Sequence, residues 1–188
     1  MQTILNRELA LSKDWCRAIG VFSFVLLTAL GAFVRIPLPF TPVPLTMQTF
    51  FVLLAAASLG GNLGAVTQLI YIGLGLSGMS VFTGSGSGMF YLFGPTSGYL
   101  FGFVLASIFI SGFIKKAESR PAFVFLLFLT ADFLLLTCGT LWLKFVLGVS
   151  IRKASLMGFI PFAAGDIIKV FAVTALFLKF KARFREIF

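Results

Sequence analysis

The stretch PAFVFLLFLTADFLLLTCGTLWL, residues 121–143, is predominantly apolar and contains a single charged side chain, Asp132. A helix that crosses the hydrocarbon core of a bilayer needs about 20 residues of this kind. The stretch therefore predicts a transmembrane helix. Similar runs, separated by prolines, glycines and charges, predict further spans at about 18–34, 47–59, 63–79, 95–116 and 159–179.

The composition of the whole chain agrees with a membrane protein. Of its 188 residues, 59% are hydrophobic and 11% are charged, whereas soluble domains have roughly 45–50% apolar and about 25% charged residues. Short loops leave room for about six spans and for no soluble catalytic domain. We therefore expect an all-α fold, a polytopic bundle of about six transmembrane helices that forms one domain over residues 1–188.

Two segments interrupt the apolar runs on the same side of the predicted bundle. Residues 35–45 contain four prolines, which exclude a helix interior. Residues 84–88 read GSGSG and lack the lysine of a phosphate-binding loop, so neither nucleotide binding nor an intrinsic ATPase is expected. Glycine and serine here allow the backbone to approach a ligand closely, and a flexible outer cap is the alternative.

The distribution of lysine and arginine predicts the orientation. With the N-terminus in the cytoplasm, ten of these residues fall on the inner side and four on the outer side, and Lys169 lies inside a span. This bias satisfies the positive-inside rule. We expect a multi-pass protein of the cell membrane with both termini cytoplasmic, so that the proline segment and the Gly-Ser run lie outside.

The charge and residue inventory argues against several function classes. The net charge is +9, but the basic residues flank apolar segments and form no stripe with aromatics, so no nucleic-acid partner is expected. The chain has no histidine, the commonest metal ligand and the commonest general base at neutral pH. We expect no metal, no cofactor and no enzymatic activity.

Asp166 and Lys169 are the strongest candidates for a functional site. Their spacing of three places both on one face of the last span, in its outer half. Charged side chains within a transmembrane helix usually face a cavity or the interior of the bundle. The two could form a structural salt bridge. Alternatively, they could bind a small polar ligand, with Asp166 accepting hydrogen bonds from its N–H groups and Lys169 donating to its oxygens.

The other polar residues in the predicted spans could each have a structural or a functional role. Asp132 could bond a neighbouring helix or take part in the site, and Gln48 at the start of the second span could be interhelical glue or a ligand contact. Thr28 and Ala32 form a small-xxx-small pair that lets another helix approach closely. That helix could be internal or could belong to a partner.

Several blocks of the chain together resemble one family. They are RIPLPFTPVPLTMQT at 35–49, Val81-Phe82 with the glycine run, FGPTSGYL at 93–100, and GDIIK at 165–169. In this order they are similar to the BioY family, the biotin-specific substrate-capture subunits of energy-coupling-factor transporters. The resemblance covers nearly the whole chain.

The resemblance implies a six-helix subunit with an outward-facing biotin pocket, working with a transmembrane coupling subunit and two cytoplasmic ATPases. It implies that Asp166 and Lys169 contact the ligand and that the loop at 83–88 adds a polar contact, with Thr83 and Ser85 as candidates. Gln48 falls in the matching Gln-Thr pair. Where the family has an alanine-xxx-alanine coupling face, this chain has Thr28 and Ala32, so partner docking is less secure.

The chemistry of biotin fits these residues. Its ureido group carries two N–H donors and a carbonyl, its valeryl chain ends in a carboxylate, and its bicycle is apolar. Aromatic side chains could form the apolar walls of a pocket; the candidates are Phe40, Phe82, Phe90, Tyr91 and Tyr99. Two alternatives remain open: a solitary biotin facilitator, and a membrane enzyme that uses Asp132 and Asp166 as acid and base.

Overall fold

The computed structural model describes residues 2–188, with side chains from Lys13 onward, and most of these residues are helical. The prediction of an all-α bundle is confirmed. The elements in chain order are α1 (Gln2–Phe33), β1 (Arg35–Ile36), β2 (Leu45–Thr46), α2 (Gln48–Ser58), α3 (Leu63–Leu76), the 3₁₀ turn η1 (Met89–Phe93), α4 (Ser97–Ala117), α5 (Pro121–Leu147), α6 (Ile151–Gly158) and α7 (Ile160–Ile187).

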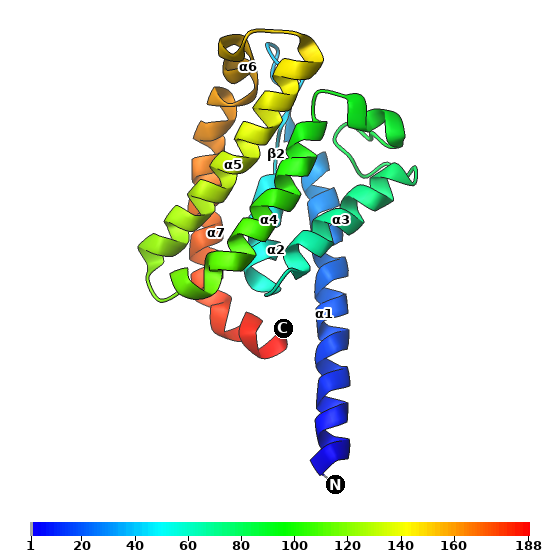
Figure 1. Ribbon diagram of the computed structural model, residues 1–188, viewed down its shortest axis with the longest axis vertical. Coiled ribbons are helices and arrows are strands. Elements are labelled where there is room, and N and C mark those ends of the chain that lie inside the picture. The colour runs from blue at the N-terminus through cyan, green and yellow to red at the C-terminus, as the bar shows by residue number, and fades with distance from the viewer. Residues whose placement is uncertain (1) are drawn as a thin grey trace.

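The short helix α2 lies at the centre of the bundle. It packs against α1, α3, α4 and α7, and its residues from Val52 to Ser58 are all buried (Figure 1). At 11 residues it is shorter than a bilayer-spanning helix needs to be. The rest of the protein covers α2 from Val52 to Ser58, so this part of the short helix lies in the interior of the bundle.

Helices α4 and α5 run side by side along their length (Figure 1). Glycines on α4 allow this close approach: a Cβ on Gly102 would lie 2.9 Å from the Leu135 carbonyl oxygen and 3.0 Å from the Leu135 Cα. Pro121 occupies the first turn of α5, where a proline has no missing hydrogen bond. Gly148 ends the helix in the left-handed conformation, with φ of 61°.

The structure differs from the predicted boundaries around the last two spans. The α5 helix extends past Lys144 to Leu147, because one exposed lysine does not interrupt a helix that ends at the next glycine. The loop that should follow it contains α6, capped by the Ser150 hydroxyl, which accepts from the Lys153 N–H. The basic tail after Lys179 continues α7 as helix to Ile187.

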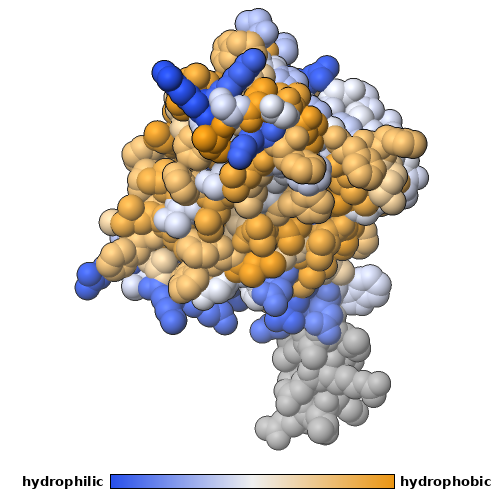
Figure 2. Space-filling model, turned by 45° about the horizontal axis from the view of Figure 1, so that its top comes forward, coloured by the Kyte–Doolittle hydropathy of each residue, from blue (hydrophilic) through white to orange (hydrophobic). Residues whose placement is uncertain are grey.

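Four stretches of the described chain are long and apolar enough to cross a membrane: Lys13–Phe33, Ser97–Ala117, Pro121–Leu147 and Ile151–Ile187. The helices α2 and α3 are apolar but shorter. Figure 2 shows an apolar belt between hydrophilic side chains gathered at the two ends. These features are those of a membrane protein. The count of six transmembrane helices stays a prediction.

The proline segment folds back as a short antiparallel pair, with Arg35 opposite Thr46 and Ile36 opposite Leu45. This return places the start of α2 against α1, where a Cβ on Gly31 would lie 3.0 Å from the backbone nitrogen of Gln48. Thr28 and Ala32 are both fully buried in this region. The close-approaching helix is internal, so this pair offers no surface to a partner, contrary to the predicted partner interface.

Candidate functional site

Asp166 and Lys169 lie one turn apart on α7 and form a buried ion pair. The Lys169 Nζ donates to Asp166 Oδ1, and the two residues are 2% and 7% exposed. Among the ion pairs of the described residues, this is the one in which both side chains are buried. Removing two charges from water is costly, and the pair keeps acceptor and donor capacity for a further polar group.

The pair faces a cavity of about 40 Å³ between α2, α3, α4, α5, α7 and the segments that precede α2 and α4. Its polar lining combines carboxylate, ammonium, amide, hydroxyl and phenol groups, and its apolar lining is aliphatic and aromatic. The residues that surround it are Val43, Pro44, Thr46, Gln48, Thr49, Tyr71, Thr83, Tyr91, Thr96, Tyr99, Leu100, Phe103, Leu135, Leu136, Phe162, Asp166 and Lys169.

Gln48 connects two helices to the loop between α3 and α4. Its Nε2 donates to the Tyr71 hydroxyl over 2.7 Å, and the Tyr71 hydroxyl donates to the Val81 carbonyl over 3.0 Å. On the other side, the Thr83 hydroxyl donates to Gln48 Oε1 over 3.1 Å. These hydrogen bonds, here called the Gln48 network, hold residues 81–83 over the cavity.

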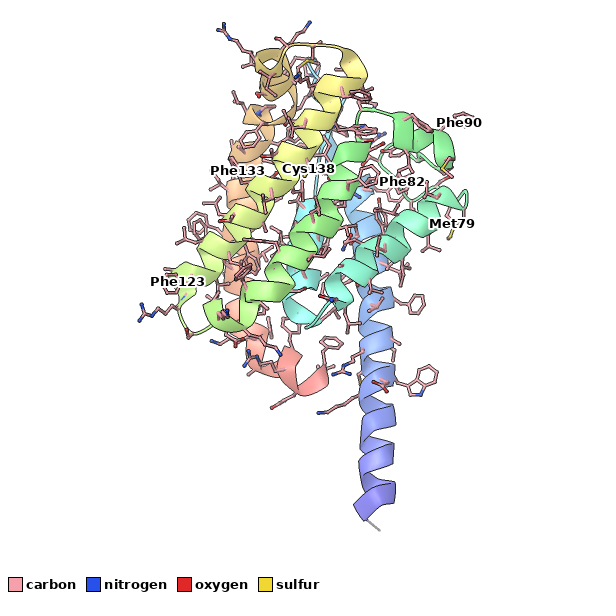
Figure 3. The ribbon with its side chains drawn as sticks, viewed as in Figure 1. Met79, Phe82, Phe90, Phe123, Phe133 and Cys138 are labelled. Atoms are coloured by element: carbon pink, nitrogen blue, oxygen red, sulfur yellow. The ribbon has the colours of Figure 1, made fainter. Side chains whose placement is uncertain are left out.

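Aromatic packing supports the same loop. The Phe82 ring is fully buried, stacks on Tyr91 at 4.6 Å between centroids, and meets Tyr71 edge-on at 5.6 Å. In Figure 3, Phe82 lies against the bundle while Phe90 points away from it. Burial raises the pKa of the Tyr91 phenol, so it stays protonated and donates to the Thr83 carbonyl over 3.4 Å.

Tyr99 forms part of the cavity wall from α4. Its hydroxyl donates to the Gly158 carbonyl over 2.7 Å, and its ring packs 6.0 Å from Phe162. Gly139 and Gly158 leave the space that the Tyr99 side chain fills. The Tyr99 phenol therefore links α4 to the junction of α6 and α7, which lies about two helical turns before Asp166.

Five of the predicted ligand-binding residues line one cavity: Asp166, Lys169, Thr83, Gln48 and Tyr99. Ser85 does not, because it lies exposed at the tip of the loop with φ of 59°.

Of the predicted aromatic walls, Tyr91 and Tyr99 line the cavity and Phe82 packs behind it. Phe40 is 55% exposed and Phe90 is 91% exposed, so neither forms a wall. Both aromatics lie at the protein surface.

The structure adds Tyr71, which the sequence analysis missed. A phenol in the middle of an apolar helix was the available signal, since a buried tyrosine hydroxyl usually has a partner.

Asp132 is buried at 3% exposure on α5, one turn before Leu135 and Leu136, and it does not line the cavity. Its Oδ1 has no hydrogen-bond partner among the described residues. Asp166 lines the cavity and Asp132 does not, so the structure does not place both carboxylates of the enzyme hypothesis on this cavity.

Tyr71→Phe is expected to speed ligand release about thirtyfold. The substitution keeps the ring but removes one donated and one accepted hydrogen bond, each contributing about 1 kcal/mol, from the contacts that hold residues 81–83. Tyr91→Phe is the matched control, because its one bond to the loop is long at 3.4 Å and its loss should matter less. Dissociation of radiolabelled ligand from solubilised protein measures both, and equal rates for parent and Tyr71→Phe would contradict the role of the Gln48 network.

Comparisons with known proteins agree with the geometry. Residues 6–186 match the model of the BioY family. The chain is 37% identical to a biotin transporter BioY of Thermotoga maritima over 84% of this chain and 91% of that protein. It is 50% identical to a BioY protein of Lysinibacillus sphaericus over 54% of this chain, a match that spans half of that protein's length.

The fold is similar to a crystal structure of the S-component for biotin from an ECF-type ABC transporter. The TM-score is 0.82 at 22% sequence identity, and the match covers 90% of this chain and 92% of that one. At this identity the likeness establishes the arrangement of the helices. The role of each side chain in the cavity is argued from its contacts in this chain.

Proposed function

We propose that this chain, which belongs to the BioY family, takes up biotin as the substrate-specific subunit of a transporter. In this proposal the vitamin is captured in the cavity that Asp166 and Lys169 line. The observation that carries the site assignment is the buried ion pair facing a cavity lined by polar groups and aromatic rings. A purely structural ion pair could be replaced by packed apolar groups at little cost. Such a pair would also need no cavity beside it.

The chemistry of each end of biotin suggests where it lies. Asp166 accepts from the two ureido N–H groups, and Lys169, already bonded to Asp166, donates to a ligand oxygen. Tyr99 and Phe162 pack against the bicycle. The hydroxyls of Thr83 and Tyr91 face the remaining polar atoms from the loop.

Binding requires the loop between α3 and α4 to move outward. The cavity of about 40 Å³ has space for a few water molecules, whereas pockets for ligands of this size occupy roughly 300–1,000 Å³. The part that moves in this proposal is residues 81–91, which lie outside the helices α3 and α4 and are held by the Gln48 network, by the Phe82–Tyr91 stack and by the contact of Phe82 with Tyr71 on α3. In this conformation the loop is closed.

Equilibrium binding of radiolabelled biotin to the detergent-solubilised protein tests the function. We expect saturable binding of one biotin per chain. Excess lipoic acid, which has a similar acyl chain and carboxylate but no ureido group, should not compete, because Asp166 needs N–H donors. Failure of the parent protein to bind biotin would overturn the assignment, and full competition by lipoic acid would move the recognition away from Asp166.

The orientation and partners follow from the same function. All six apolar segments cross the cell membrane in this proposal, with α2 and α3 as short spans inside the bundle and both termini in the cytoplasm. The basic residues then gather at the cytoplasmic end and the cavity opens outward. A transmembrane coupling subunit and two cytoplasmic ATPases energise the uptake.

Uptake into proteoliposomes separates this energised mechanism from a solitary facilitator. We expect the purified chain alone to bind biotin without accumulating it, because nothing in the described residues resembles a nucleotide site. Addition of the coupling subunit and ATPases with ATP should start accumulation. Saturable uptake by the chain alone, without ATP, would favour the facilitator.

A further inference from the structure

A second and much larger cleft lies at the end of the bundle away from the biotin cavity. It measures about 1120 Å³ and is bounded by α1, α2, α3, α4 and the last turns of α7. In Figure 1 this is the end at which the C-terminus lies beside α1. It shares no lining residue with the biotin cavity, so it would bind a ligand other than the biotin in that cavity.

The mouth of this cleft is cationic. Four basic and two acidic side chains line it: Arg17, Lys115, Lys181, Arg185, Asp14 and Glu118. Arg17 pairs with Asp14 and Arg185 pairs with Glu118, which satisfies both carboxylates. Lys181 donates to the Glu118 carbonyl over 3.0 Å, and neither it nor Lys115 has an ion-pair partner in the part of the chain that the structure describes. Lys115 and Lys181 are therefore the two cationic side chains of the mouth that the carboxylates of the described residues leave unpaired, while Arg17 also donates to the Phe188 oxygen over 2.9 Å.

The interior of the cleft is apolar and reaches the lipid-facing surface. Ile114 and Phe177 form buried walls, Ile70 lies half-buried on α3, and Phe22 on α1 is 61% exposed. One polar group lies among them. The Ser58 side chain is 4% exposed, and its Oγ has no hydrogen-bond partner among the described residues, although it lines the cleft.

We propose that this cleft binds one anionic phospholipid, with its phosphate between Lys115 and Lys181 and an acyl chain along Phe22 and Ile70. A soluble anion would use only the charged mouth, and an uncharged apolar molecule would use only the walls. An acidic phospholipid satisfies both, and the Ser58 hydroxyl donates to an ester oxygen of the same molecule. Basic pockets between helices at the cytoplasmic side recognise such headgroups through the same combination of charge and apolar contact.

The test compares two lipids in the same protein sample. Delipidated protein is mixed with equal amounts of phosphatidylglycerol and phosphatidylcholine, and native mass spectrometry measures which lipid is retained. We expect one phosphatidylglycerol per chain in clear preference, with a fall of about fivefold for each of Lys115→Gln and Lys181→Gln. The matched controls are Lys144→Gln and Arg152→Gln, which remove the same charge at the opposite end and should leave the preference unchanged.

Each outcome decides the proposal. Equal retention of the two lipids would overturn it and leave the cleft to a protein partner, and an equal effect of the control variants would reduce it to general surface attraction. Displacement of phosphatidylglycerol by millimolar inorganic phosphate would show that the phosphate alone is recognised, which also overturns a lipid site. Biotin binding is measured on the same variants and should not change, so failure here leaves the transport function intact.

Discussion

Asp166→Asn is expected to weaken biotin binding about a hundredfold while the protein remains folded. Asparagine keeps the shape of aspartate but replaces one carboxylate oxygen with an N–H donor that opposes the ureido donors. Two hydrogen bonds to a charged acceptor contribute about 1.5 kcal/mol each at the low end of their range, and a loss of about 3 kcal/mol corresponds to about a hundredfold in the dissociation constant. Calorimetric or radioligand titration measures the change.

Thermal stability, measured on the same variants, distinguishes a ligand contact from a structural ion pair. Loss of one partner strands the other charge in a buried position, so Asp166→Asn and Lys169→Met should each lower thermal stability. The double variant Asp166→Asn/Lys169→Met removes the stranded charge and should recover much of the stability. If the pair is purely structural, biotin binding should recover as well; if Asp166 contacts biotin, binding stays weak.

Asp14→Asn is the matched control, since it makes the same carboxylate-to-amide change at an exposed position at the other end of the bundle. We expect its biotin affinity to remain within twofold of the parent. Parent-like binding by both Asp166→Asn and Lys169→Met would place the site elsewhere.

The sequence predicted the charged part of this site because charge in an apolar span is expensive and therefore informative. Asp166 and Lys169 stand out in a predicted span, residues 159–179, that has no other charge before its last residue, and their spacing alone puts them on one face. The spans were predictable for a related reason, since lipid demands long apolar runs. Asp132 carries the same signal but lies beside the cavity, because spacing along one helix does not say which neighbour that face meets.

The contacts between distant segments could not be predicted from local pattern. Tyr71 joins the site only because α3 packs against α2 at the level of Gln48. Thr83 and Ser85 are two residues apart in one flexible-looking loop, yet the bridge between Phe82 and Gly86 turns one toward the cavity and leaves the other exposed at the tip. Thr28 and Ala32 indicated a close-packed surface correctly, and only the fold shows that the partner helix is internal.

Gly102→Val is expected to lower the free energy of unfolding by about 3 kcal/mol, which for a chain of this length lowers the melting temperature by about 10 °C. The new side chain would meet the backbone of Leu135, 2.9 Å from its carbonyl oxygen and 3.0 Å from its Cα. A flexible side chain could move aside, but the backbone of a neighbouring helix cannot, so α4 and α5 must separate.

Separation of these helices should also reach the biotin cavity, because α4 provides Leu100 and Phe103 and α5 provides Leu135 and Leu136 to its wall. Gly112→Val is the matched control on the same helix, where an added Cβ has no neighbour within 4 Å and the intrinsic cost of valine in a helix is the same. Differential scanning fluorimetry in detergent compares the two variants, with biotin affinity as the second readout. Equal melting temperatures would mean that α4 and α5 tolerate separation, and the close glycine contact would then not be what fixes the position of the cavity wall.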